Sequence, residues 1–217
     1  MAGDEAEGRV NGTIGRADLL ARRRRLGPLD GATVADRFVA EIDAGPPERA
    51  DGLLRPAAVL LPLIERGHGL NLVLTRRTDH LRTHSGQVAL PGGKIDRADG
   101  GSPLRAALRE AQEEIGLPPP AVEPVGLLTP FVSNSGYRIH PVVGLVAGAP
   151  ILTPNPGEVA EVFEVPLAFL MNPANHRVGS RTVGGAVRTF YVMDYDGHHI
   201  WGVTAGILRV FYDEVFR

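Results

Sequence analysis

The sequence of 217 residues contains no cysteine and only one lysine, Lys94. A chain without cysteine forms no disulfide, offers no catalytic thiolate and builds no cysteine-ligated zinc site. A mechanism through a lysine Schiff base would depend on Lys94 alone, which argues against that chemistry. Because the absence of cysteine is compatible with a reducing compartment, we expect a cytoplasmic protein.

The sequence also lacks an excess of charge and a long apolar run. Its 23 basic and 25 acidic residues give a formal charge of −2, so no overall positive field attracts nucleic acid or anionic membranes. The apolar segment 57–64 is too short to span a bilayer, and prolines interrupt the uncharged segment 139–157. Residues 1–12 carry acids and have no apolar signal core. We therefore expect neither a nucleic-acid partner nor a membrane partner.

What the chain does contain is the composition of one globular domain with many loops. Apolar residues make up 43%, charged residues make up 22%, and there are 27 glycines and 18 prolines. Residues 1–50 are predicted to be an N-terminal extension, with a disordered tail at 1–16 and short helices at 17–25 and 33–43. Residues 51–217 are predicted to form the functional domain. Deletion of residues 1–16 is expected to change activity and stability little.

The hydrophobic pattern predicts a mixed α/β fold. Strands are predicted at 57–65, 71–75, 87–90, 123–128, 139–146, 163–165 and 186–194, and helices at 103–115, 166–171 and 204–215. Because the strands arrive in pairs, a mixed or antiparallel sheet is favoured over a doubly wound parallel one.

The helix predicted at 103–115 has strong boundary signals. Ser102 is a suitable N-cap, Pro103 suits the first helical position, and Gly116 suits a left-handed terminator. Pro118 prevents the helix from continuing. We expect the helix to begin and end at these residues.

Three acidic residues, Glu110, Glu113 and Glu114, share one sector of this helix. Their like charges lie at facing spacings near the negative end of the helix dipole, at a cost of a few tenths to about 1 kcal/mol each. Arg109, four residues before Glu113, can offset part of that repulsion. The helix alone therefore leaves two interpretations open, a solvated acidic face and a metal site.

The segment 91–101 before the helix favours the metal site. It contains four glycines, which let the backbone approach a ligand, together with Asp96 and Asp99, whose oxygens suit a hard cation. Mg²⁺ or Mn²⁺ is the expected ion, and such ions commonly bridge carboxylates to substrate phosphates. The pattern indicates phosphoanhydride chemistry.

The sequence does not match the known phosphate-binding and calcium-binding loop motifs, because residues that these motifs require are missing at specific positions. A Walker loop would need a glycine at Val88 and a serine or threonine at Ile95, and an EF-hand loop would need an acid or asparagine at Ala98. The sequence also contains no His-Glu-x-x-His or Gly-x-Ser-x-Gly string, which argues against a zinc protease or an α/β-hydrolase.

The glycine loop followed by the segment Arg109-Glu110-Ala111-Gln112-Glu113-Glu114-Ile115-Gly116-Leu117 resembles the Nudix box. The second half of the box matches at every position. In the first half, Asp99 replaces a glutamate, and nine residues instead of seven separate Asp99 from Arg109. The resemblance implies the α/β class, as a Nudix-type α/β/α sandwich with a mixed sheet and a catalytic loop and helix.

The upstream segment 74–93 is similar to the motif that marks coenzyme A pyrophosphatases within the Nudix family. Leu90 stands where that motif usually has phenylalanine, and Thr78 where it usually has serine or alanine. The likeness extends over residues 56–215 and leaves the first 50 residues outside it. It implies a coenzyme A diphosphatase.

The resemblance also implies roles for individual residues. It assigns the divalent metal to Glu110, Glu113, Glu114 and Gly93, with Glu110 and Glu114, one turn apart, as the favoured direct ligands. Either of these two could also accept the proton of the attacking water. Glu158, outside the box, is a candidate further catalytic acid beside the three helix glutamates, because similar enzymes often supply one from this region.

Substrate contacts are assigned to Arg82, His84, Gln87, Gly92 and Arg76. Arg82 is the candidate for the 3′-phosphate of coenzyme A, with Arg76 and Arg77 as alternates, because a guanidinium can bind two phosphate oxygens at once. Trp201 is expected to pack the last helix against the sheet, and stacking on a nucleotide is the lesser alternative.

The function implied is hydrolysis of coenzyme A or acyl-CoA to adenosine 3′,5′-bisphosphate and 4′-phosphopantetheine, with Mg²⁺ or Mn²⁺. The alternatives are hydrolysis of ADP-ribose, NADH or nucleotide sugars, and a Nudix-fold binding module without turnover. The expected partner is a small-molecule substrate, and a homodimer is possible.

Overall fold

The computed structural model describes residues 12–29, 39–40, 54–80, 84–183 and 185–217. Within these residues the larger sheet consists of β1 (Val39–Ala40), β2 (Arg55–Arg66), β3 (Gly69–Arg77), β4 (Val88–Ala89), β5 (Gly92–Lys94), β6 (Val122–Leu127), β7 (Phe131–Val132), β8 (Tyr137–Val146) and β9 (Val159–Pro166). The smaller sheet consists of β10 (Arg177–Val183), β11 (Ala186–Tyr195) and β12 (His198–Trp201). The α-helices are α1 (Arg16–Arg22), α2 (Pro103–Ile115), α3 (Leu167–Leu170) and α4 (Gly202–Phe211), and a π-helical turn follows at Tyr212–Phe216. No helix among the described residues has the length and apolarity needed to cross a bilayer.

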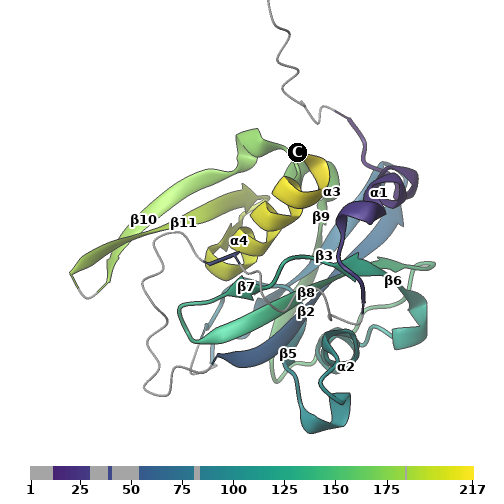
Figure 1. The fold of residues 1–217 in the computed structure, drawn as a ribbon, viewed down its shortest axis with the longest axis horizontal. Coiled ribbons are helices and arrows are strands. Elements are labelled where there is room, and N and C mark those ends of the chain that lie inside the picture. The colour runs from purple at the N-terminus through teal and green to yellow at the C-terminus, as the bar shows by residue number, and fades with distance from the viewer. Residues whose placement is uncertain (1–11, 30–38, 41–53, 81–83, 184) are drawn as a thin grey trace, which may run out of the picture.

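The centre of the larger sheet is β2, which pairs in parallel with β8 and antiparallel with β3. Side chains alternate along β2, so that Leu61 and Leu63 enter the core beneath α4, and Leu60 and Ile64 enter the core beneath α2. Figure 1 shows the sheet lying between these two helices. The predicted α/β/α sandwich with a mixed sheet is confirmed.

Most predicted elements are present. The strands predicted at 57–65, 71–75, 87–90, 123–128, 139–146, 163–165 and 186–194 correspond to β2, β3, β4, β6, β8, β9 and β11. Helix α2 has the predicted bounds, with the Ser102 hydroxyl accepting the Arg105 N–H at 3.3 Å and Gly116 at φ +67°. The helix predicted at 204–215 is α4 together with the π-helical turn.

The prediction missed β7, β10 and β12, and it assigned the residues of β5 to a loop. Strand β10 contains glycine, serine and arginine without a clear hydrophobic alternation, and it is a strand because it pairs along its whole length with β11. In β5, Gly93 pairs with Ala58 of β2. These strands depend on their partners and not on local propensity.

The N-terminal segment is packed more closely against the rest of the domain than its sequence suggests. The helix predicted at 17–25 is present as α1 with a 3₁₀ turn at Arg23–Arg25. At 33–43 the helix prediction is wrong for the two described residues, because Val39–Ala40 form β1 and pair in parallel with β7. The other residues of that prediction lie outside the described part of the chain.

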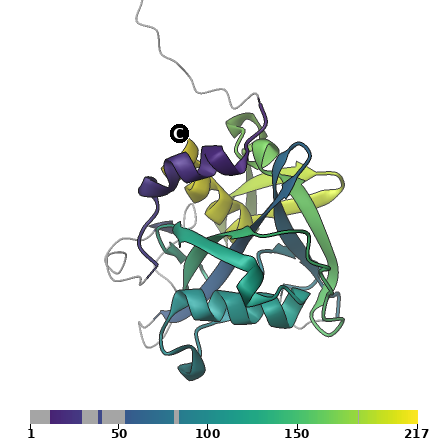
Figure 2. The ribbon, with the colours of Figure 1, turned by 90° about the vertical axis from the view of Figure 1, so that its right-hand side faces the viewer.

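Two residues near α1 belong to the main core. Leu19 is fully buried, and Ile14 is 5% exposed while its carbonyl accepts the Leu70 N–H at 2.7 Å. Figure 2 shows α1 lying beside the end of the chain, where Arg25 donates to the Arg217 carbonyl at 2.8 Å. The expectation that residues 1–16 are dispensable conflicts with this packing, whereas the domain division at residue 50 stays a prediction.

Candidate active site

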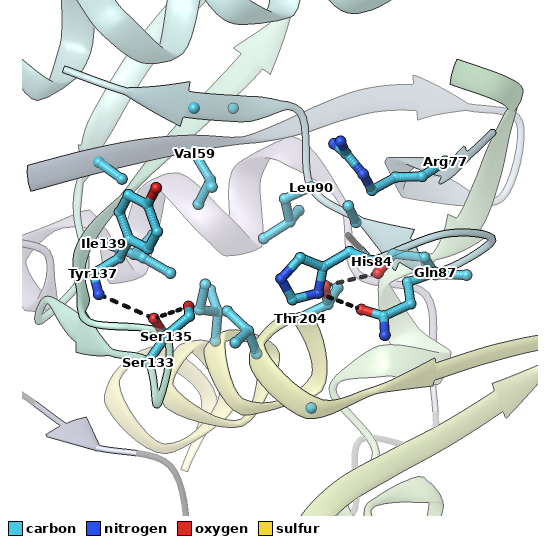
Figure 3. Close-up of a pocket in the computed structure, with 18 of the residues that line it drawn as sticks. Val59, Arg77, His84, Gln87, Leu90, Ser133, Ser135, Tyr137, Ile139 and Thr204 are labelled. Carbon is cyan, nitrogen blue, oxygen red and sulfur yellow. Dashed lines mark hydrogen bonds between the residues drawn. The ribbon is translucent and has the colours of Figure 1, made fainter. Parts of the chain in front are cut away.

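A cavity of about 730 Å³ opens between the α2 side of the sheet and α4. Figure 3 shows Tyr137 and Ser135 at one end and Arg77 and Gln87 at the other, with His84 between the two ends and Thr204 at the start of α4 below them. The Thr204 hydroxyl donates to the Val88 carbonyl at 2.9 Å, which ties α4 to β4 at the cavity wall. The predicted residues His84, Gln87, Gly92, Gly93, Glu110, Glu114 and Glu158 all line this cavity.

The two glycines of β5 let helix α2 approach the sheet. A Cβ on Gly92 would lie 2.4 Å from the Ala58 carbonyl oxygen, and a Cβ on Gly93 would lie 2.5 Å from Glu110 Oε1. Any other residue at either position would push the strand or the carboxylate away. The bare backbone of β5 therefore forms the floor on which the Glu110 carboxylate lies.

Glu114 is a buried acid with few polar partners. It is 5% exposed, and one of its oxygens accepts the Gly92 N–H at 3.1 Å. Burial raises the pKa of Glu114 to about 7, and the carboxylate of Glu110 adds to the rise. Among the residues that the structure describes, the nearest cationic side chain is Arg77, 4.0 Å away. Much of the cost of burying this carboxylate is therefore left uncompensated by the protein.

Glu158 reaches the same place from a loop attached to the end of α2. The Asn155 N–H donates to the Glu114 carbonyl at 2.8 Å, and the Glu158 N–H donates to the Asn155 carbonyl at 3.0 Å. Burial is the main cause of the raised pKa of Glu110, and the charge of Glu158 contributes to the raised pKa of both Glu110 and Glu114. Three carboxylates thus repel one another at the cavity wall.

Glu113 lies next to Glu110 on the helix surface but outside the cavity. Its side chain is 58% exposed, it is not among the cavity residues, and it accepts an Arg109 N–H at 3.1 Å. The pairing with Arg109 is the charge compensation that the sequence suggested. The same Arg109 nitrogen also donates to Glu110 Oε1 at 2.9 Å, so Glu113 and Glu110 share this cation although only Glu110 lines the cavity.

Asp99 is brought to Arg109 in spite of the longer loop. The Arg109 guanidinium binds both Asp99 oxygens, at 3.1 and 3.0 Å, and also donates to the Lys94 carbonyl at 3.1 Å. Gly100 and Gly101 adopt positive φ angles of +61° and +77°, which allows the two extra residues to turn before the helix. The hydrogen bonds from Arg109 hold the pKa of Asp99 below its usual range.

The proposed substrate residues divide into two groups. His84 Nδ1 and Gln87 Oε1 lie 2.9 Å apart at the cavity. Arg76 is not at the cavity and instead contacts Glu161 at 3.3 Å, whereas Arg77 lines the cavity, because neighbouring side chains on β3 point to opposite faces. Arg82 lies outside the described residues.

Two more residues line the cavity beside these groups. Sequence reasoning did not identify Arg181, which comes from β10, a strand that was not predicted. Trp201, at the end of β12, was expected mainly to pack α4, with stacking on a nucleotide as the lesser alternative. The aromatic character of Trp201 was visible in the sequence, but its neighbour Arg181 carried no signal.

The acids at the cavity fit a hard divalent cation, because carboxylate oxygens are the ligands that Mg²⁺ and Mn²⁺ prefer. Among the described residues, no three acidic or histidine side chains already converge on one point as ligands of a single ion. Mg²⁺ usually binds through one or two carboxylates and keeps several waters. The pair Glu110 and Glu114, one helical turn apart, is therefore a sufficient donor set.

Comparison with known proteins agrees with this geometry. The NUDIX domain model matches residues 53–183. Proteins named uncharacterized Nudix hydrolase NudL, from Escherichia coli (strain K12 / DH10B) and from Shigella boydii serotype 18, are each 42% identical over 155 residues, which covers 71% of this chain and 80% of theirs.

A crystal structure of RenU, a Nudix hydrolase from M. smegmatis, aligns with 52% of this chain and 71% of its own at 26% identity and a TM-score of 0.45. The domain model and the curated relatives carry the assignment. The chain belongs to the Nudix hydrolase family.

Proposed function

We propose that this Nudix hydrolase cleaves the diphosphate of coenzyme A or acyl-CoA to adenosine 3′,5′-bisphosphate and a 4′-phosphopantetheine product. Nudix hydrolases use divalent metal ions and act on small-molecule substrates. The observation that carries the proposal is one cavity that combines the acid pair Glu110 and Glu114, the polar pair His84 and Gln87, and an apolar wall. The likeness of segment 74–93 to the coenzyme A pyrophosphatase motif supports the same substrate.

Glu110 and Glu114 are proposed to hold the divalent cation, with Glu158 as the further acid. Gly93 allows Glu110 to lie against the backbone, and Gly92 orients Glu114 through its N–H. A bound divalent cation would lower the pKa of a water molecule and neutralise charge on the diphosphate. Glu113 stays a candidate ligand of the divalent cation, although its side chain is more exposed than those of Glu110 and Glu114.

The reaction breaks one phosphorus–oxygen bond of the diphosphate bridge and forms another to the oxygen of water. One proton of that water passes to a carboxylate, for which Glu110, Glu114 and Glu158 are the candidates at the cavity. His84 and Gln87 are placed to bind phosphate oxygens or the nucleotide. The apolar side chains Val59, Leu90 and Ile139 can pack against a pantetheine arm.

The test is a set of single-substrate assays with coenzyme A, acetyl-CoA, ADP-ribose and NADH, each with Mg²⁺, with Mn²⁺ and with EDTA. We expect kcat/KM for a coenzyme A substrate to exceed that for the others by about tenfold or more, which corresponds to about 1.4 kcal/mol. Chromatography should identify adenosine 3′,5′-bisphosphate as a product, and EDTA should abolish turnover. A preference for ADP-ribose or NADH would replace the proposal with the alternative hydrolase. Absence of turnover on all four substrates would favour a binding module.

A further inference from the structure

Arg181 and Trp201 form a cation and aromatic pair at the cavity. The Arg181 guanidinium carbon lies 5.2 Å from the centre of the Trp201 ring, and both residues line the cavity that holds the acid pair. Phe190 of β11 packs at a tilt against the same indole, with the ring centres 5.2 Å apart. The indole is thereby supported from the protein side while Trp201 remains partly exposed.

The pair is built by the hairpin of β10 and β11, which projects past the end of α4 in Figure 1. Register places Arg177, Gly179 and Arg181 on one face of β10, and Gly179 packs against Phe190, where a Cβ would lie 2.9 Å from the ring. Trp201 pairs with Val192 of β11 on the neighbouring edge. The sheet therefore fixes the relative positions of the cation and the ring.

Among the described residues near the site, Arg181 differs from the other arginines because it has no acidic partner within 4.0 Å. Arg77 has Glu114 at 4.0 Å, and Arg177 is ion-paired with Asp194. Within the described part of the chain, no carboxylate lies within 4.0 Å of the Arg181 guanidinium. An arginine that lines a cavity without a carboxylate partner is available for an anionic group of a ligand.

We infer that Arg181 and Trp201 bind the nucleoside end of the substrate, with the indole stacking on the base and the guanidinium binding a phosphate on the ribose. This inference rests on the proposed function for the identity of the ligand. Aromatic rings and guanidinium planes both stack on bases, and a guanidinium can bind two phosphate oxygens at once. The indole thus offers a contact for the adenine that all these substrates share, and the guanidinium offers the contact that distinguishes coenzyme A from substrates without a 3′-phosphate.

The experiment uses the single tryptophan of the chain, Trp201, as its own probe. Adenosine 3′,5′-bisphosphate is titrated into the full-length protein with Mg²⁺ while the intrinsic fluorescence is recorded, and AMP is titrated in parallel. We expect quenching by both nucleotides, with a Kd for the bisphosphate about tenfold lower or more. Absence of quenching by millimolar adenosine 3′,5′-bisphosphate would overturn the inference.

Variants then separate the two roles. Arg181→Ala should reduce the preference for the bisphosphate over AMP to about twofold or less, and Arg181→Lys should keep part of it, because the charge remains and the planar fork is lost. Arg177→Ala is the matched control on the same face of β10, and it should leave the preference unchanged because Arg177 pairs with Asp194 outside the cavity. Equal loss of affinity for both nucleotides in Arg181→Ala would overturn the phosphate role, as would loss of the preference in Arg82→Ala alone.

Kinetics distinguish this inference from the proposed function. If the wild-type protein hydrolyses coenzyme A but Arg181→Ala lowers kcat/KM equally on coenzyme A and dephospho-CoA, the inference fails and the proposed function stands. If the wild-type protein prefers ADP-ribose, the proposed function fails. The fluorescence titrations with adenosine 3′,5′-bisphosphate and AMP still test whether Arg181 and Trp201 bind a nucleotide with a phosphate on its ribose.

Discussion

Two buried acids that contact helix α2 or belong to it lie in opposite electrostatic environments. Outside the cavity, Asp99, in the turn before α2, is 3% exposed and receives two hydrogen bonds from Arg109, which lower its pKa. On the cavity side, Glu114 is 5% exposed and has one backbone hydrogen bond and a cation only at 4.0 Å, and its pKa is raised. Equal burial thus accompanies opposite electrostatics.

The difference indicates which carboxylate stabilises the fold and which is available for a ligand. A buried acid with a bidentate arginine is satisfied by the protein itself. A buried acid without such a partner would gain more from a bound cation, because the cation would supply the missing charge. Arg109 of α2 therefore forms a structural ion pair with Asp99 and also donates to the candidate ligand Glu110 at 2.9 Å, whereas the candidate ligand Glu114 has no arginine so close.

The largest effect should come from removing the cavity acids. We expect Glu110→Gln and Glu114→Gln each to lower kcat by about 100-fold or more, because loss of a metal ligand removes several kcal/mol of charge stabilisation in the transition state. Glu113→Gln is the matched control, and it should lower kcat by less than about tenfold, because its side chain lies outside the cavity. Steady-state assays at saturating Mg²⁺ measure all three.

Equal losses in all three variants would erase the distinction between the acids inside and outside the cavity and return Glu113 to the metal site. Wild-type rates in Glu110→Gln or Glu114→Gln would contradict the assignment of the acids. Circular dichroism should show that each variant keeps its secondary structure.

The next effect concerns the structural pair. Asp99→Asn should lower the free energy of unfolding by about 2–3 kcal/mol, because Arg109 loses a charged bidentate partner. Asp96→Asn is the control from the same loop, and it should cost less than about 1 kcal/mol, because Asp96 is exposed and 3.8 Å from Arg109. Urea unfolding measures both, and a stable Asp99→Asn variant would contradict the structural role.

The smallest effect is the opposite pH dependence of the two acids. The pKa of Glu114 is raised to about 7 in the folded protein. The unfolded chain therefore ionises this carboxyl at a lower pH than the folded protein does, and the metal-free fold loses stability as pH rises from the ordinary pKa of a glutamate to above 7. In EDTA, Glu114→Gln should therefore be more stable than the wild type at pH 8 by about 1–3 kcal/mol and similar to it at pH 5.

Asp99 should behave in the reverse sense. Its pKa is lowered, so its stabilising contribution is present above its ordinary pKa and is lost only as pH falls through the lowered value. The deficit of Asp99→Asn should therefore persist from pH 8 to pH 5. A Glu114→Gln variant that is less stable than the wild type at pH 8 in EDTA would show that the protein already compensates this carboxylate.

Much of the active-site helix was predictable from local sequence. Ser102, Pro103 and Gly116 determine the ends of α2, because capping and backbone conformation depend on residues that are neighbours in the chain. The spacing of Glu110 and Glu114 places both acids one turn apart in any helix. The glycines of the preceding loop indicated a close backbone approach, which Gly93 makes against Glu110.

Other features of the site could not be predicted from the local sequence pattern. Glu113 is equivalent to Glu110 and Glu114 in the sequence pattern, yet only packing against the sheet separates it from the cavity. Likewise, Arg76 and Arg77 are adjacent in sequence, and the pairing of β3 decides which of them faces the site.

By itself, the sequence determined the family, the helix of the candidate site with its caps, and the acids proposed for that site, Glu158 among them. Tertiary structure alone decided that Glu113 lies outside the cavity, that Arg109 binds Asp99 across a longer loop, and that Arg181 meets Trp201 at the cavity. The physical reason is the distance along the chain over which each kind of interaction acts. Helix periodicity, capping and turn chemistry act over a few residues, whereas these contacts join segments that become neighbours only when strands pair and the helices pack on the sheet.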